Sequence, residues 1–178
     1  PGTHAVGVDP NPRLAQGVDA PLPANTTVLR ETSDAFFARG AGERAALFGG
    51  RGTLDLTFID GLHTFDQALR DFINAERLAP PGGKGVVLFH DWHPVDRTSA
   101  LRDRATTFWA GDTWKVVLIL LRFRPDLRLR VVEAAPTGLG VVTNLDPAST
   151  VLADRFDAIV AEYTALGYDD HFVDGRFR

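Results

Sequence analysis

Acidic and imidazole side chains gather at two points of this sequence, each directly after a short apolar run. Carboxylates suit magnesium, calcium or manganese, and each added imidazole moves the preference toward zinc, iron or manganese. A metal bound there could lower the pKa of a substrate hydroxyl, or a histidine could take the proton as a general base. The candidate residues are Asp60, His63, His90, Asp91 and His93.

Two strands and a connecting helix are expected to bring these residues together. Residues 54–59 and 85–89 are nearly continuous apolar runs, which are typical of parallel strands buried on both faces. Between them, residues 65–73 repeat apolar side chains at helical spacing, and Thr64 with Gln67 predicts a capping box at the start of that helix. Because such crossovers are almost always right-handed, the two strands should end side by side, where open α/β sheets bind ligands.

Each candidate residue also has an ordinary structural explanation. Asp60 could cap a helix, His90 could be a hydrogen-bonded core histidine, and Asp91 could anchor a loop. For any one residue this explanation weighs about as much as a functional one. For the whole group it weighs less, because so many acids and imidazoles fall near two adjacent strand ends.

The N-terminal part contains two further strands. Residues 4–9 read as a short buried strand that ends in Asp9, and residues 26–30 as a second one. In nucleotide-binding folds an acid at such a strand end accepts hydrogen bonds from ribose hydroxyls, while a turn or cap aspartate is the alternative. Ser33 or Asp34 is expected to cap a helix over residues 35–39, and backbone N–H groups there could also contact a ligand base.

The C-terminal part is predicted to alternate helices and strands. Residues 97–108 are polar and could be helical, and a helix that opens at Gly111 is apolar nearly all round, which indicates deep burial or a subunit contact in a homo-oligomer. Residues 127–131 show the alternation of a half-exposed strand, and residues 138–143 close a hairpin with it. A last helix is predicted over residues 149–166.

Composition limits the class of protein. The chain has 178 residues, 44% hydrophobic and 24% charged, which suits one globular domain over residues 1–178. The net charge of −4 argues against nucleic acid or an anionic membrane as partner, and no apolar run could span a bilayer. Without cysteine there is no disulfide scaffold and no thiol nucleophile. We expect a cytoplasmic protein.

Several of these segments together resemble the class I S-adenosylmethionine-dependent methyltransferases. The segments are Phe58-Ile59-Asp60-Gly61-Leu62-His63, Leu78 to Gly83, and Val87-Leu88-Phe89-His90-Asp91. The branch with this signature is that of small-molecule O-methyltransferases that modify sugars and antibiotics. The strand that ends at Asp9 and the late strand over residues 138–143 also fit, so the resemblance covers most of the chain, although the central motif carries its specificity.

The resemblance implies a Rossmann-like, doubly wound α/β fold with a mostly parallel sheet and a C-terminal antiparallel hairpin strand. In this family a first strand and a glycine-rich loop, which cradles the methionine part of the cofactor, come ahead of the segment that matches Val6. The sequence offers no residues for them, so we expect the domain to be N-terminally incomplete.

The resemblance also implies roles for single residues toward a small-molecule acceptor. S-adenosylmethionine would be bound by Asp9, Ser33, Asp34 and Asp60. A magnesium ion, where one is used, would be held by Asp60, His90 and Asp91. Catalysis would fall to His63, as base for a substrate hydroxyl, and to Asp60.

Two other functions stay open on the sequence alone. The first is a metal-dependent hydrolase that uses the same acids and imidazoles around zinc or manganese. The second is a degenerate nucleotide-fold module without catalytic activity that serves as a partner subunit. The expected lack of the first strand favours the module, whereas the intact cluster argues for an enzyme.

Overall fold

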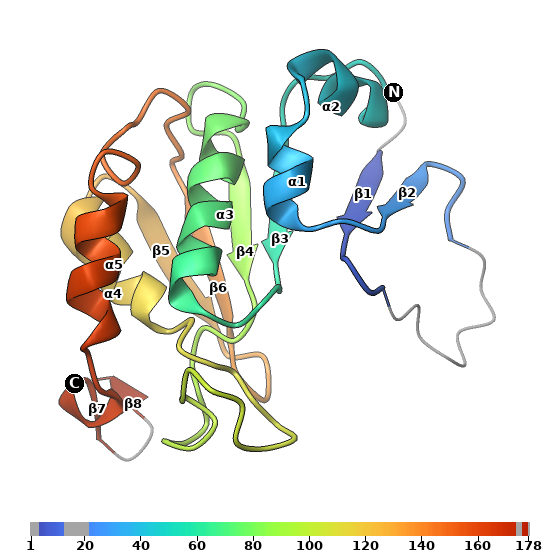
Figure 1. Ribbon diagram of the computed structural model, residues 1–178. Helices are drawn as coiled ribbons and strands as arrows, with labels where there is room; N and C mark the ends of the chain where they lie inside the picture. The colour runs from blue at the N-terminus through green and yellow to red at the C-terminus, as the bar shows by residue number, and fades with distance from the viewer. Residues whose placement is uncertain (1–3, 13–21, 174–175, 178) are drawn as a thin grey trace. The chain divides into compact units, whose positions relative to one another are not determined.

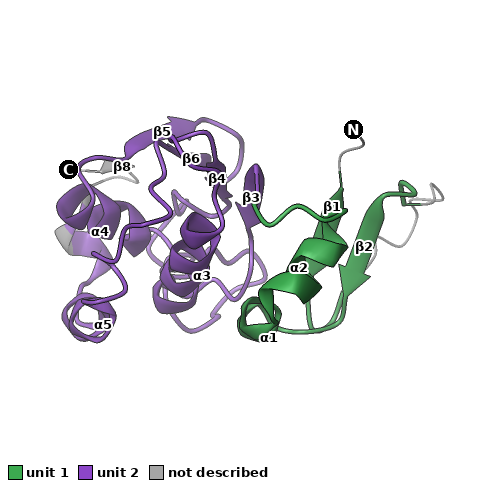
Figure 2. Cartoon of the chain, turned by 90° about the horizontal axis from the view of Figure 1, so that it is seen from above, with its two compact units in different colours: residues 1–53 green, residues 54–178 purple. Residues whose placement is uncertain are grey.

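The computed structural model describes residues 4–12, 22–173 and 176–177, and the chain divides into two compact units. These are Pro1–Thr53 and Leu54–Arg178, which Figure 2 shows in green and purple. The expectation of one domain over residues 1–178 stays a prediction. None of the helices in the described ranges is long and apolar enough to cross a membrane.

The first unit contains a parallel pair of strands and two short helices. Its elements in chain order are β1 (Ala5–Val8), β2 (Thr26–Leu29), α1 (Ser33–Ala38) and α2 (Ala41–Leu47). The two strands pair in parallel, with Ala5 opposite Thr26. Both strands were predicted, although the first is partly exposed rather than buried.

The predicted cap of the first helix, Ser33 or Asp34, is wrong by one or two residues. Thr32 is the N-cap of α1, and its hydroxyl accepts a hydrogen bond from the Ala35 backbone N–H at 3.2 Å. Ser33 and Asp34 are instead the first two helical residues, where the acidic side chain suits the positive end of the helix dipole. Thr32 has the extended backbone that an N-cap requires.

The second unit is built on a mixed four-stranded sheet in the order β3-β4-β6-β5. Its main elements are β3 (Leu56–Ile59), α3 (Phe65–Arg77), β4 (Val86–Phe89), α4 (Lys115–Phe123), β5 (Arg128–Val132), β6 (Leu139–Thr143) and α5 (Phe156–Thr164). After α5 come a short 3-10 helix (Tyr168–Asp170) and the antiparallel pair β7 (Phe172–Val173) and β8 (Arg176–Phe177). The β3–β4 pair is parallel, while β6 runs antiparallel to both β4 and β5. A mixed α/β fold with an antiparallel late strand is thereby confirmed, though the sheet is not mostly parallel.

The core of the second unit lies between this sheet and its three helices. Figures 1 and 2 show α3, α4 and α5 on one face of the sheet, toward which Ile59, Val87 and Phe89 project from β3 and β4. On the other face, the side chains of Leu56 and Phe58 are 59% and 53% exposed. The prediction that β3 is buried on both faces is therefore wrong, because the helices of this unit pack on one face.

Four local predictions also need correction. Residues 97–108 form turns and bends rather than a helix, and the following helix begins at Lys115 rather than at Gly111. The last helix covers Phe156–Thr164, since residues 151–155 form turns before it. Thr64 is the N-cap residue of α3 but makes no side-chain capping hydrogen bond, so the predicted capping box is absent.

A tryptophan next to the candidate site is packed directly on the backbone of β6. Trp92 follows Asp91, is fully buried, and makes an edge-on ring contact with Phe89, with the centroids 4.8 Å apart. Its ring lies against Gly140, where an added Cβ would overlap the indole. Gly140 therefore leaves room for the side chain that anchors the end of β4.

Replacing Gly140 with alanine should lower the free energy of unfolding. The new methyl group would press on a fully buried ring, and overpacking of this kind costs about 1–3 kcal/mol. The loss is measured by urea unfolding with Gly52→Ala as the control, because an added Cβ at Gly52 meets no atom within 4 Å. Equal stability of the two variants would contradict this packing.

Candidate active site

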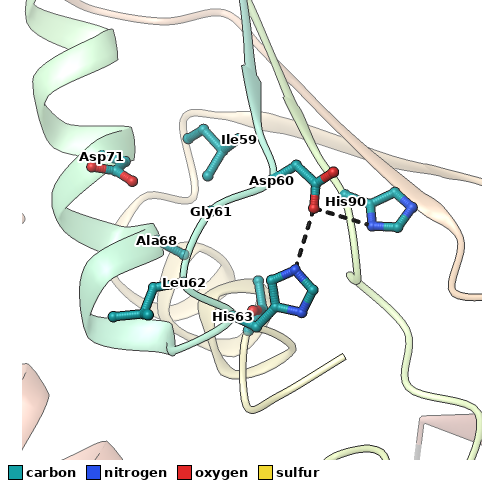
Figure 3. A pocket seen from close by; sticks show the side chains of 9 residues that line it. Ile59, Asp60, Gly61, Leu62, His63, Ala68, Asp71 and His90 are labelled. Atoms are coloured by element: carbon teal, nitrogen blue, oxygen red, sulfur yellow. Dashed lines mark ion pairs between the residues drawn. The ribbon is translucent and has the colours of Figure 1, made fainter. Parts of the chain in front are cut away.

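Four of the predicted residues meet where β3 and β4 end. Ile59 and Phe89 are partners in the parallel register, so Asp60 and His90 follow the two strands at the same level. The His90 backbone N–H also donates to the Ile59 carbonyl at 3.0 Å. Figure 3 shows the Asp60 carboxylate between the rings of His63 and His90.

The two carboxylates share both imidazoles. His63 Nε2 lies 3.3 Å from Asp60 Oδ1 and 3.2 Å from Asp91 Oδ2. His90 Nδ1 lies 3.4 Å from the same Asp60 oxygen and 3.0 Å from the same Asp91 oxygen. Two acidic oxygens so placed repel each other unless positive charge stands between them. The site is therefore built to hold a proton or a cation at its centre.

The tautomer of His63 follows from its other ring nitrogen. Nδ1 lies 2.8 Å from the Trp109 carbonyl oxygen, which can only accept a hydrogen bond, so Nδ1 carries a proton. The Trp109 ring also stacks on the imidazole, with centroids 5.2 Å apart and planes 23° apart. Nε2 is thereby the nitrogen left to exchange a proton or bind a cation.

Both of the residues that face each other across the site have left-handed backbones. His63 has φ 57° and Asp91 has φ 54°, a conformation that costs a non-glycine residue free energy and persists only where its surroundings hold it. Gly111, with φ 66°, packs so closely on His63 that an added Cβ would overlap its carbonyl oxygen. Such close contact fixes the backbone of His63 against the loop that follows β4.

This segment, residues 93–114, is called the β4–α4 loop, and Asp112 ties it to the start of α3. The Asp112 backbone N–H donates to the His63 carbonyl at 3.2 Å, and its carboxylate accepts from the Phe65 N–H at 2.9 Å. Asp112 is buried and pairs with Lys115 at 3.2 Å. The Asp112 carboxylate thus accepts a hydrogen bond at the N-terminus of α3, where the Thr64 hydroxyl was expected to cap the helix.

The charges of the site move two pKa values in opposite directions. The pKa of His63 is raised above its ordinary 6.5, chiefly by the hydrogen bond to Asp60 and also by the charge of Asp91, while burial opposes the rise. The pKa of Asp60 is lowered below 3.8, chiefly by its hydrogen bond with His63, against the effect of burial. Without a metal, the two carboxylates therefore favour the protonated form of His63.

The donor set also fits a divalent metal ion. One ligand atom each of Asp60, His63 and Asp91 lie within 4.8 Å of one another. Adjacent ligands of an octahedral ion stand about 3 Å apart, close to the separations found here. Asp91 is 4% exposed, and its Oδ2 has no hydrogen bond that meets normal geometry, although both imidazoles lie near it. The metal ligands predicted from the sequence were Asp60, His90 and Asp91, whereas this group of ligand atoms contains His63 in place of His90.

The other predicted residues belong to other parts of the chain. Asp9, Ser33 and Asp34 belong to the first unit, where Asp9 is exposed directly after β1 and accepts a hydrogen bond from the Asn11 N–H at 2.7 Å. His93 donates its backbone N–H to the Thr137 carbonyl, and burial lowers its pKa. His93 does not line either of the two cavities described at the site.

Sequence reasoning missed the residues that the β4–α4 loop brings to the site. A cavity of about 390 Å³ opens beside His63, His90 and Asp91, and the loop contributes Arg104, Thr107, Phe108 and Trp109 to its walls. The aromatic pair Phe108-Trp109 was the available signal, but the predicted helix over residues 97–108 concealed it. The backbone carbonyl of Trp109 leaves no signal in the sequence.

Residues 2–92 match a family model described as a methyltransferase domain, which covers a little over half of the chain. A comparison with curated proteins found no match.

Replacing Asp60 with asparagine should lower the pKa of His63 in metal-free protein, because the asparagine removes the hydrogen-bonding charge that raises it. The pKa is read from the imidazole NMR signals across a pH titration, with Asp154→Asn as the control. An unchanged His63 pKa would contradict the geometry of the site.

The sign for stability follows from the same shift. The raised pKa makes His63 protonation stabilise the fold fully below pH 6.5, and this contribution is lost as the pH rises through the folded-state value. The lowered pKa of Asp60 acts oppositely, with its contribution lost as the pH falls through the folded-state value. The free energy of unfolding of the wild-type protein should therefore exceed that of Asp60→Asn most clearly between about pH 3.8 and pH 6.5, where both contributions are fully present.

Proposed function

This chain belongs to the methyltransferase domain family, and on that premise we propose that it transfers a methyl group from S-adenosylmethionine to a hydroxyl of a small polar molecule, such as a sugar or natural product. The observation that supports the choice of a hydroxyl is that His63 lines a cavity of about 390 Å³, while its Nδ1 is bonded to the Trp109 carbonyl and leaves Nε2 as the nitrogen that can accept a proton. Cavities of this size accommodate small molecules.

Residues of the first unit are proposed to bind the cofactor, which supplies the methyl group when bound. Asp9 is exposed at the end of a parallel strand, as an acceptor for ribose hydroxyls must be. Ser33 and Asp34 begin α1 and are proposed to contact the adenine. Asp60, which follows β3, is proposed to contribute to cofactor binding in the second unit.

His63 is proposed as the general base. A hydroxyl placed at Nε2 gives its proton to the imidazole as the new O–C bond forms, while the S–C bond of the sulfonium breaks and its electron pair stays on sulfur. Nδ1 remains bonded to the Trp109 carbonyl, so the ring cannot turn away. Asp60 stabilises the resulting imidazolium. Methyl transfer also needs in-line alignment of the two reactants, which the walls of the cavity would provide.

A magnesium ion is proposed as an aid to this reaction. Asp60 and Asp91, with His90 as the imidazole, would hold the ion and leave Nε2 of His63 free to act as base. A cation at that position supplies charge that lowers the pKa of a nearby hydroxyl.

The donor set of Asp60, His63 and Asp91 also suits a second candidate, a hydrolase that binds zinc or manganese tightly. In that enzyme His63 would be a ligand and could not serve as base. The metal content of the purified protein separates the two functions. We expect little zinc or manganese, since a weak magnesium site loses its ion during purification, and one tightly bound ion per chain would favour the hydrolase.

His63→Ala should lower kcat for methyl transfer by roughly 10²–10⁴-fold, because a positioned base contributes about that much. His4→Ala is the control, since this exposed histidine lies outside the cluster. The rate is measured as S-adenosylhomocysteine release at saturating acceptor. Retention of wild-type kcat in His63→Ala would exclude His63 as the base.

S-adenosylhomocysteine should raise the melting temperature of the protein, because a ligand that binds only the folded state stabilises it. At a hundredfold excess over Kd the added free energy of unfolding is about 2.7 kcal/mol. Asp9→Ala should reduce this shift, because the ribose loses its acceptor, while Asp154→Ala should keep it. Absence of any shift in the wild-type protein would contradict the cofactor proposal. An unchanged melting-temperature shift in Asp9→Ala would exclude Asp9 from cofactor binding but would leave the cofactor proposal itself standing.

A further inference from the structure

Of the two cavities described at the site, one is large enough for an acceptor and the other is not. The cavity beside His63, His90 and Asp91 has a volume of about 390 Å³, within the range of small-molecule sites. A neighbouring cavity, between Asp60, Asp71 and Thr113, offers about 10 Å³, roughly the space of one water molecule. The acceptor therefore belongs in the larger cavity, whose walls define its chemistry.

One wall of this cavity is aromatic, and one of its rings is held by a hydrogen bond. Trp109 stacks on His63 and donates its indole N–H to the Leu101 carbonyl at 2.6 Å. Phe108, its neighbour in the lining, is 45% exposed. An exposed aromatic wall next to the proposed base suits the flat face of a ring.

The same cavity has one cation in its lining that lacks an acidic partner. The β4–α4 loop contains three arginines, of which Arg97 pairs with Asp169 at 2.7 Å and Arg102 with Asp66 at 2.8 Å. Arg104 makes no ion pair within the described chain. Its Nε and Nη2 donate to the Thr106 and Thr107 carbonyls at 3.3 and 2.9 Å.

Those two carbonyls hold the guanidinium without neutralising it. A side chain already held in place loses less entropy when it binds a ligand. Nη1 makes no hydrogen bond to the described residues, so it is available to an anion. Arg104 is also the only lysine or arginine among the described residues that line the cavity, which include the buried acid Asp91.

We propose that the acceptor is a hydroxylated ring compound that carries a carboxylate, bound with the carboxylate on Arg104, the ring against Phe108 and Trp109, and the hydroxyl toward His63. This inference rests on the proposed function and names its substrate class. A single unneutralised arginine favours a monoanion over a phosphate dianion. Asp91, a buried acid 3.2 Å from His63 Nε2, disfavours an anionic group next to the base, so the carboxylate of the acceptor is assigned to Arg104.

The test compares binding of charged and uncharged versions of the same molecule. Protocatechuate and glucuronate, each with its uncharged amide, are titrated into the full chain by calorimetry in the presence of S-adenosylhomocysteine, which requires no turnover. Wild-type protein should bind at least one carboxylate about tenfold or more tightly than its amide, as expected for a hydrogen bond to a charged group.

Arg104→Gln should abolish this preference, because it keeps the length of the side chain and removes the charge. Arg97→Gln is the matched control from the same loop and should keep the preference. No preference in wild-type protein, no binding of either carboxylate, or a preference that survives Arg104→Gln would each overturn the inference.

Methyl transfer to the four compounds is measured in parallel, so that the two proposals can fail separately. Arg104-dependent binding without transfer to any of the four compounds would support the carboxylate site and count against methyl transfer. Equal methylation of carboxylates and amides by both wild-type and Arg104→Gln protein would uphold methyl transfer and overturn the carboxylate site.

Discussion

The site depends on two carboxylates held close together at the ends of adjacent parallel strands. Asp60 and Asp91 repel each other, and the structure compensates by giving each acidic oxygen the same two imidazole neighbours. Asp91 is buried, so its charge cannot be screened by water and must be balanced by His63, His90 or a metal ion. The chemistry proposed for the chain follows from this demand for positive charge between two acids.

The β4–α4 loop meets that demand by fixing the orientation of His63. The Trp109 carbonyl sets the tautomer, Gly111 packs on the His63 backbone, and Asp112 binds both His63 and Phe65. The left-handed backbone of His63 is maintained by these contacts rather than by its own preference. The loop that positions the proposed base also lines the cavity, so the proposed roles in catalysis and in acceptor recognition fall to one segment.

The meeting of Asp60, His63, His90 and Asp91 could be predicted because it needs only apolar runs, a connecting helix and the handedness of the crossover. The contacts that the β4–α4 loop makes with His63 and Phe65 could not be predicted, because they join residues distant in sequence. A buried carboxylate from Asp112 serves the start of α3, and a charged acceptor binds more strongly than the Thr64 hydroxyl. The helix predicted over residues 97–108 fails where the Ser99 carbonyl accepts from both Ala110 and Gly111 and closes the segment into a loop.

The central claim is that Asp60 and Asp91 act as parts of one site. A double-mutant cycle of Asp60→Asn and Asp91→Asn tests it most directly, with kcat/KM measured for the acceptor that the wild-type protein methylates best and with magnesium present. The account predicts that the double variant loses little more activity than the worse single variant, because either change already disrupts the shared centre. Losses in kcat/KM that multiply independently would show that the two acids serve separate sites, which contradicts the account.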